Sequence, residues 1–417
     1  MFPVLLVAAA LELSNPPTGA ELARLLWDNA PDLQAARARV AQARADVERA
    51  GLLPNPQLDV GVGALPVGPQ TPGAMVETPW LEVPNASVGV SELIELGKRG
   101  PRQASASAAL EATLHDARAQ LLQRYWEVRA NLGEVAAAQA RIAELAALTQ
   151  DAERLAGLQR ARADRGDTSQ LDADRAALEV EKFSSTLGAE QEHLVAELRD
   201  CAALVGVRCS AFEGPEAASQ YLSAIEAPGT SLGDRPDVRA LVASEASQRA
   251  AQLLAERHAI PDPTVRVGYL RDQYVASGNW QNSFFAGVSI PLPVFDRNQP
   301  EARAAAAAAE SSRRARERTL VSAKEQLERV AAQKKSVDGR RAQLRGKALP
   351  LAREVVARLD AAVLRGAASI QDVLLARRTL VELQLLANDL DLAGFHARLD
   401  EARLSGALPF VPEELVP

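Results

Sequence analysis

Two similar stretches decide the fold: Leu53-Pro-Asn-Pro56, followed by the alternating residues 57–64, and Ile260-Pro-Asp-Pro263, followed by the alternating residues 264–269. Proline cannot continue a helix, so each Pro-x-Pro stretch ends the helical pattern that precedes it. In the residues that follow, apolar and polar side chains alternate, which is the period of a β-strand. Each stretch therefore predicts the end of a helix and the start of a strand.

The chain is duplicated around these two stretches. A second alternating run follows a loop in each half, at residues 87–91 and 283–290. Long segments rich in Ala, Glu and Arg come next, and each is broken once by a short turn, Arg165-Gly-Asp-Thr-Ser169 or Arg365-Gly-Ala-Ala-Ser369. The predicted organisation is a first repeat at 21–207, a linker at 208–234, a second repeat at 235–406 and a C-terminal tail at 407–417.

The long segments predict helices that pack along their length. Their apolar residues recur at steps of three and four, the spacing of a helix-on-helix seam. One helix is predicted over residues 101–163, and Pro350 predicts a kink or a harmless local break in a later one. The first predicted seam comprises Leu121, Tyr125, Val128, Leu132 and Val135, and the second comprises Leu383, Leu386, Leu390, Ala393 and Ala397.

The predicted strands have one apolar and one polar side. In the first strand, Leu58 and Val60 fall on one side and Gln57 and Asp59 on the other. This pattern suits a transmembrane barrel with lipid outside and water inside, or a small half-buried sheet packed on helices. One chain with only four strands cannot close a barrel, so the first interpretation requires several chains to pool their strands. The candidate interfacial aromatics are Trp80, Tyr269 and Trp280.

Several motifs carry a resemblance to a known family. They are Leu53-Pro-Asn-Pro56, Gly89-Val-Ser91, Glu95-Leu-Gly-Lys-Arg99 and residues 366–377. Together with the duplicated order of helices and strands, they resemble the TolC family of outer-membrane efflux proteins over about residues 20–406. The Pro-Asn-Pro and Gly-Lys-Arg segments look most like the heavy-metal branch, the CzcC-like and CusC-like ducts.

The resemblance implies a mainly α fold with a small β part. Long helical hairpins would form a periplasmic α-barrel, and the four strands of each chain would contribute to a trimeric barrel in the outer membrane. The implied partners are two further copies of the chain, outer-membrane lipid, a periplasmic adaptor protein and an inner-membrane RND-type pump. The duct itself would use no cofactor and would export heavy-metal cations or small toxic molecules.

The resemblance also implies roles for the two short turns as periplasmic tips, with the loops around residues 66–84 and 271–282 outside the cell. Asp172 and Asp372 match positions where the family carries aspartates at its aperture. The alternative is that the two aspartates cap the helices that begin there. The implied adaptor contacts are Arg165, Gly166, Asp167, Thr168, Ser169, Arg365, Gly366 and Ser369.

Two features bear on the cellular compartment. Cys201 and Cys209 are close enough in sequence to pair in an oxidising compartment, and two free buried thiols are the equal alternative. Residues 1–20 resemble the remnant of a signal peptide, with an apolar N-terminal tail as the alternative.

Other function classes find little support in the sequence. The net charge of −7, without a clustered basic face, disfavours a nucleic-acid partner. The four histidines have no paired ligand spacing, so no metal site is predicted. Neither a nucleophile elbow nor a phosphate-binding loop occurs, so we expect no enzyme. The remaining alternative to a duct is a soluble, elongated helical scaffold.

Overall fold

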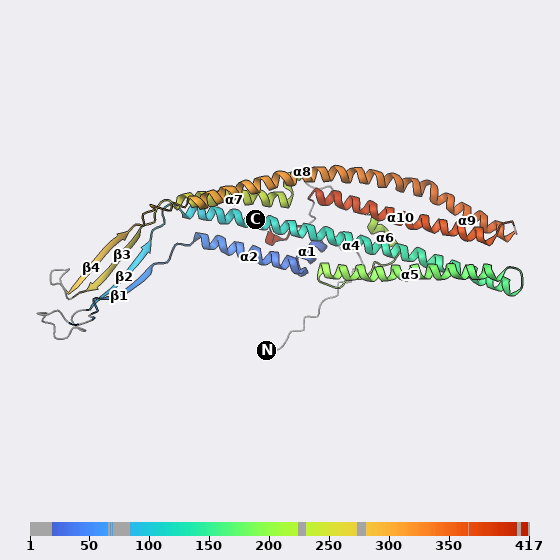
Figure 1. The fold of residues 1–417 in the computed structure, drawn as a ribbon, viewed down its shortest axis with the longest axis horizontal. Helices are drawn as coiled ribbons and strands as arrows, with labels where there is room; N and C mark the ends of the chain where they lie inside the picture. The colour runs from blue at the N-terminus through green and yellow to red at the C-terminus, as the bar shows by residue number, and fades with distance from the viewer. Residues whose placement is uncertain are drawn as a thin grey trace. The chain divides into compact units, whose positions relative to one another are not determined.

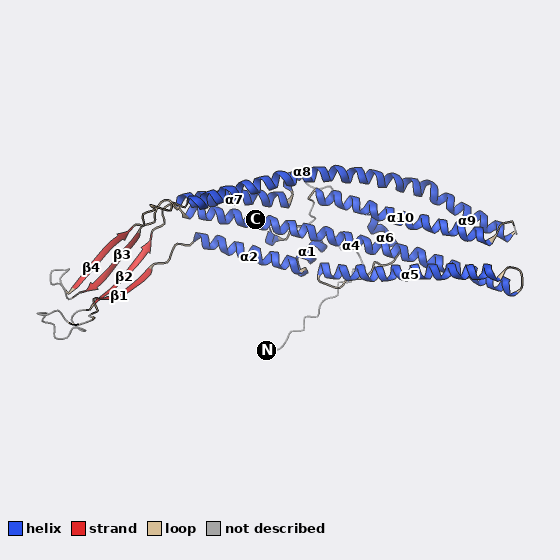
Figure 2. Cartoon of the chain, viewed as in Figure 1, coloured by secondary structure: helices blue, strands red, loops and turns tan. Residues whose placement is uncertain are grey.

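The computed structural model describes residues 19–65, 67, 69, 84–223, 231–272, 281–365, 367–406 and 410–415. The predicted signal remnant falls almost wholly outside these residues, as do Trp80, Trp280 and Gly366. Figures 1 and 2 show long helices and one four-stranded sheet. Within the described residues, no helix combines the length and apolar character needed to cross a membrane.

The elements repeat in the predicted order. The first half contains α1 (Gly19–Asn29), α2 (Pro31–Gly51), β1 (Gln57–Gly63), β2 (Asn85–Leu93), α4 (Arg99–Asp164) and α5 (Gln170–Val205). After α6 (Pro215–Ser223), the second half contains α7 (Pro236–Arg257), β3 (Thr264–Arg271), β4 (Asn282–Ser289), α8 (Gln299–Gln343), α9 (Leu349–Leu364) and α10 (Ile370–Leu404).

The chain divides into two compact units, and each unit takes segments from both halves of the sequence. Unit 1 comprises Met1–Arg39, Leu114–Ala240 and Arg316–Pro417, and unit 2 comprises Val40–Thr113 and Leu241–Ala315. The helical turns near residues 165 and 365 belong to unit 1, and the sheet belongs to unit 2. The units are thus a different division of the chain from the predicted repeats.

The core of unit 1 lies along α4 and α10. All five residues of the first predicted seam are almost fully buried, which confirms that seam. The second seam was wrong at Leu386, whose side chain is 47% exposed, because the neighbouring Ala387 takes the buried position beside Leu390. At Gly133 the two helices come so close that an added Cβ would lie 2.4 Å from Cε1 of Phe395.

In its described part, the predicted linker between the two halves is folded against unit 1. Helix α6 contacts α10. The ring of Tyr221 packs between two phenylalanine rings, with its centroid 5.1 Å from that of Phe212 and 5.4 Å from that of Phe395. The side-chain amide of Gln139 donates to Phe212 O at 3.1 Å and its carbonyl accepts from Phe212 N at 2.9 Å. Cys201 and Cys209 form a disulfide with their Cα atoms 6.0 Å apart. This bridge holds the linker against the end of α5.

The C-terminal residues also fold back onto unit 1. Leu415 is fully buried, and Arg118 donates a hydrogen bond to its carbonyl oxygen. Trp27 Nε1 donates to Glu414 at 3.3 Å, and Arg37 forms an ion pair with the same carboxylate. The predicted tail is therefore, in its described part, a packed element.

Pro350 sits at a break in the helical hydrogen-bond pattern. Residues Leu344–Ala348 form a π-helical segment, in which Leu349 N donates to Leu344 O, five residues earlier. Proline has no N–H to donate and its ring crowds the preceding turn, so a wider turn accommodates it. The break predicted from Pro350 takes this form, and Leu344 and Leu349 remain buried.

In unit 2 the sheet is antiparallel, with strand order β1-β2-β3-β4. The segment between β2 and α4 is fixed by two ion pairs. Lys98 Nζ lies 2.6 Å from Asp262 Oδ2, and Arg102 binds the Glu95 carboxylate and the carbonyl of Ala50. The Glu95-Leu-Gly-Lys-Arg99 motif thus ties the strands to the helical segments of its own unit.

Candidate functional site

One face of the sheet is apolar and open to solvent in the single chain. The register aligns Leu58 with Val90, which in turn pairs with Val267. In the next row, the side chains of Val60 and Phe284 are 73% and 89% exposed. These exposures contradict the alternative of a half-buried sheet packed on helices. An alternating face this exposed needs an apolar surrounding or a partner surface.

The other face carries the polar residues and one aromatic that the sequence interpretation missed. The register aligns Asp59, Gly89, Gly268 and Phe285. The ring of Phe285 lies across the two glycines, because a Cβ added at Gly268 would meet it at 2.5 Å. Two glycines facing one aromatic across adjacent strands are the signal that could have revealed this contact.

Both edges of the sheet are open. Within the described residues, β1 pairs only with β2, and β4 pairs only with β3. Each outer strand therefore presents a row of backbone N–H and C=O groups to its surroundings. Such edges are templates for pairing with a strand of another chain.

In unit 1, the first short turn is closed by its own backbone and by Ser169. Gly166 has a φ of +79°, and Asp167 N donates to Arg162 O at 2.8 Å. The hydroxyl oxygen of Ser169 accepts from Asp172 N at 3.1 Å and caps α5. Glycine is needed here because a side chain is strained at positive φ.

The second short turn repeats this cap in a more complete form. Asp372 N donates to the Ser369 hydroxyl at 3.2 Å, and Ser369 N donates to the Asp372 carboxylate at 3.1 Å. This reciprocal pair is a capping box at the start of α10. The Asp372 carboxylate therefore caps α10, whereas the Asp172 carboxylate accepts hydrogen bonds from the hydroxyl groups of Ser169 and Thr168 and from no backbone N–H that the structure shows.

A hydrogen bond joins the two turns. The side-chain amide of Gln371 donates to Asp172 Oδ1 at 2.8 Å. Hydrogen bonds from the Ser169 hydroxyl, then from Gln371, hold the pKa of the Asp172 carboxyl below its usual range. The hydroxyl and the backbone N–H of Ser369 do the same to the pKa of Asp372. These hydrogen bonds favour the charged form of both carboxylates, which is compatible with a role at an aperture.

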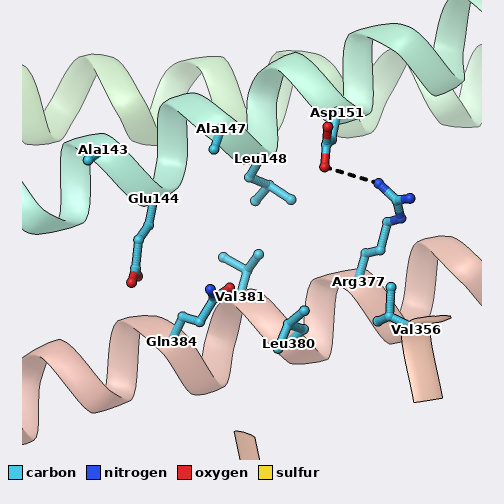
Figure 3. Close-up of a pocket in the computed structure, with 10 residues that line it drawn as sticks. All are labelled: Ala143, Glu144, Ala147, Leu148, Asp151, Val356, Arg377, Leu380, Val381 and Gln384. Carbon is cyan, nitrogen blue, oxygen red and sulfur yellow. Dashed lines mark hydrogen bonds and ion pairs between the residues drawn. The ribbon is translucent and has the colours of Figure 1, made fainter. Parts of the chain in front are cut away.

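A cavity of about 430 Å³ lies within unit 1, between α4 on one side and α9 and α10 on the other (Figure 3). Arg377 crosses it, with guanidinium nitrogens 3.2 Å from Asp151 and 3.1 Å from Asp360. Burial raises the pKa of Glu144 on the same wall, although Asn388 donates a hydrogen bond to it. The ion pairs of Arg377 span two helical hairpins and could not be identified from the sequence spacing.

Two of the histidines lie beside a single carboxylate each. His396 Nε2 lies 3.0 Å from Glu134 Oε1, and His193 lies 3.4 Å from Glu197. In the part of the chain that the structure describes, no group of His, Cys, Asp and Glu has the arrangement of a metal site.

Comparison with known proteins gives a partial family match. Residues 22–206 match the family model described as outer membrane efflux protein. No curated protein matches the chain in sequence. The family match covers most of the first predicted repeat.

Solved structures match nearly the whole chain. CusC, described in connection with folding and transmembrane channel formation, has 18% identity and a TM-score of 0.76 over 92% of this chain and 91% of its own. The outer membrane protein VceC from Vibrio cholerae has 20% identity and a TM-score of 0.71, over 92% of this chain and 95% of its own. The CmeC outer membrane channel from Campylobacter jejuni has 14% identity and a TM-score of 0.74, over 92% and 84%.

These matches establish the fold. The chain is mainly α with a small β part and has the fold of these outer membrane channels, which confirms the predicted fold class. The family match is to transport proteins, in agreement with the prediction that the chain is not an enzyme.

Proposed function

We propose that the chain is one protomer of the outer-membrane exit duct of a tripartite efflux system. The observation that carries this proposal is the sheet of unit 2, which has an exposed apolar face and two open edges. A lipid bilayer would cover the apolar face, while the opposite face, with Asp59 and Arg266 3.4 Å apart, would line a water-filled lumen.

Assembly follows from the open edges. A bilayer supplies no water to satisfy the free backbone groups of β1 and β4, so each edge must pair with another strand. Three chains of four strands each would give a closed barrel of twelve. The fold likeness to outer membrane channels supports such an assembly, and the helical hairpins would then extend into the periplasm as an α-barrel.

The two short turns are proposed as the docking tips for a periplasmic adaptor, which would connect the duct to an inner-membrane RND-type pump. Gly166 leaves the first turn without a side chain at its sharpest point, and its Cβ position faces open space. Bulky substitutions there should impair docking, both by filling this space and by straining the backbone at a positive φ. The proposed contacts are Arg165, Gly166, Asp167, Thr168, Ser169, Arg365, Gly366 and Ser369.

Asp172 and Asp372 are proposed as the aperture residues. In a trimer they would supply six carboxylates near one constriction, a ring that attracts cations and resists narrowing through mutual repulsion. The hydrogen bonds that lower both pKa values support a ring that stays charged in mildly acidic surroundings.

The proposed cargo is a heavy-metal cation or a small toxic molecule. The Pro-Asn-Pro and Gly-Lys-Arg segments, which resemble the heavy-metal branch, support the former. A duct of this kind needs no binding site for its cargo, because a driving pump delivers it into a water-filled tube.

Membrane fractionation tests the proposal against a soluble helical scaffold. We expect the chain in the outer-membrane fraction, extractable only with detergent, and an oligomer that gel electrophoresis resolves before heating but not after. Recovery as a soluble monomer would refute the duct.

Topology is tested by cysteines placed at Thr71 and Ser277, in the predicted outer loops beyond the described residues. An impermeant thiol reagent should label both on intact cells. Labelling only after rupture of the outer membrane would contradict the proposed orientation.

A further inference from the structure

The segment that follows β4 is strongly apolar and exposed. It reads Ile290-Pro-Leu-Pro-Val-Phe295 and connects β4 to α8 within unit 2. Phe295 is 99% exposed, Leu292 77% and Val294 65%. Consecutive large apolar side chains at these exposures are costly in water, so the segment needs a covering surface.

The segment continues the apolar side of the strand. On β4, every second residue from Phe284 through Ala286 to Val288 is exposed and apolar. Ile290, Leu292 and Val294 continue this spacing of two in the sequence. Pairing with β3 ends at Ser289, opposite Thr264. The apolar alternation therefore outlasts the hydrogen-bonded ladder by three positions.

The backbone of the segment has few hydrogen-bond donors to satisfy. Pro291 and Pro293 have no N–H, and Val294 N donates within the segment to Leu292 O at 2.9 Å. Donors without partners are expensive where water is scarce. Prolines at alternate positions also prevent an additional strand from pairing there. The segment thus suits an apolar surrounding better than an interface built by strand pairing.

Polar and basic residues mark where the apolar run ends. Arg297 is exposed, and Asn298 N donates to Asp296 Oδ1 at 2.7 Å in a turn that starts α8. In the first half, Ile94 and Leu96 are exposed after β2, and the exposed Arg99 follows them. An apolar run bordered by arginine matches the boundary between acyl chains and lipid phosphates, where long cationic side chains reach the headgroups.

We propose that residues 290–295 are an interfacial anchor seated in the lipid headgroup region, on the side of the membrane where the strands join the helical segments of unit 2. The partner is the lipid surface, and Arg297 and Arg99 bind its phosphates. This inference rests on the proposed function, because it places the lipid-facing side of the sheet in a membrane. It goes further by assigning lipid contact to a segment outside the strands.

Nitroxide scanning tests the anchor in the full-length protein reconstituted in phospholipid vesicles. Single cysteines are introduced at Leu292, Val294, Phe284 and Leu178 and are labelled without reductant, because the two native cysteines are paired. Leu178 on α5 is the matched control, an exposed leucine outside the proposed membrane region. The measured quantity is the ratio of collision rates with oxygen, which enriches in lipid, and with a water-soluble nickel chelate.

We expect this ratio to be several-fold higher at Leu292 and Val294 than at Leu178, with the highest value at Phe284. A ratio at both segment positions equal to that at Leu178 would show contact with water and overturn the anchor. Exclusion of both reagents there would show burial against a second copy and overturn it equally. If Phe284 also reports water, the proposed membrane duct itself fails.

Discussion

Removing the disulfide is the perturbation whose size can be worked out most directly. The Cys201–Cys209 bridge closes a loop with a sequence separation of 8. The loop-entropy relation gives about 2 to 3 kcal/mol of stabilisation for so short a loop. The disulfide also positions the segment that contains Phe212, whose ring packs against Tyr221, which in turn packs against Phe395. Cys201→Ala with Cys209→Ala should therefore destabilise unit 1 by about this amount.

The expected shift in melting temperature follows from the size of the unit. With an unfolding entropy of about 2 cal/mol/K per residue, and about 270 residues in unit 1 unfolding together, the loss corresponds to roughly 5 °C. Circular dichroism melts in detergent measure this shift, with and without a reductant. Reductant should lower the melting temperature of the wild type and leave the double variant unchanged. Equal melting temperatures for all samples would refute the stabilising role of the bridge.

Three further predictions concern unit 1. Gly133→Ala should destabilise it by about 1 to 3 kcal/mol in chemical unfolding, because the new methyl group overlaps the buried ring of Phe395. Pro350→Ala supplies a backbone N–H, so amide exchange at residues 344–350 should slow, and a change in conductance would indicate that the break has a gating role. Asp172→Asn with Asp372→Asn should reduce cation selectivity in planar bilayers while leaving the oligomer intact, and unchanged selectivity would leave only the capping role.

Two controls sharpen these tests. Gly157→Ala is the matched variant for Gly133→Ala, because no neighbouring element comes within 4 Å of its Cβ position and the substitution should raise helix stability. For the aspartate substitutions, the control is the pH dependence of cation selectivity in the wild-type protein. Both carboxyl pKa values are lowered, so the caps contribute fully above the ordinary carboxyl pKa and are lost only as the pH falls through the lower, folded-state pKa. Wild-type selectivity should therefore persist into the ordinary titration range of a carboxyl group.

The sequence predicted the features that depend on local pattern. Pro56 and Pro263 placed the starts of β1 and β3 correctly, because proline blocks a helix wherever the rest of the chain lies. The steps of three and four from Leu121 to Val135 identified a buried helix face. These signals need only neighbouring residues.

Features that depend on distant residues were missed or misplaced. In the sequence, Phe285 interrupts the alternation of apolar and polar residues. Only the strand register shows that its ring covers Gly89 and Gly268. Arg377 pairs with Asp151 on a separate helical hairpin, and Leu415 accepts a hydrogen bond from Arg118, which is hundreds of positions earlier in the chain. The spacing of residues in the sequence does not indicate such contacts. Leu386 was assigned to the seam because a leucine outweighs the adjacent alanine in any apolar count, although the smaller Ala387 fits the closer approach.

The division of the chain into interleaved units determines how much of the chain must be synthesised before each unit can fold. The central strand pair joins Val90 to Val267, so the sheet cannot begin to close until most of the chain has left the ribosome. Unit 1 waits still longer, because its packing includes Leu415 near the end of the chain. Contacts between such distant residues make folding slow, because the chain must lose the entropy of closing a long loop before the strands can pair. The proposed outer-membrane location would require export through a secretion pore, and a chain that can complete neither unit until late in synthesis would reach that pore before a finished domain could block its passage.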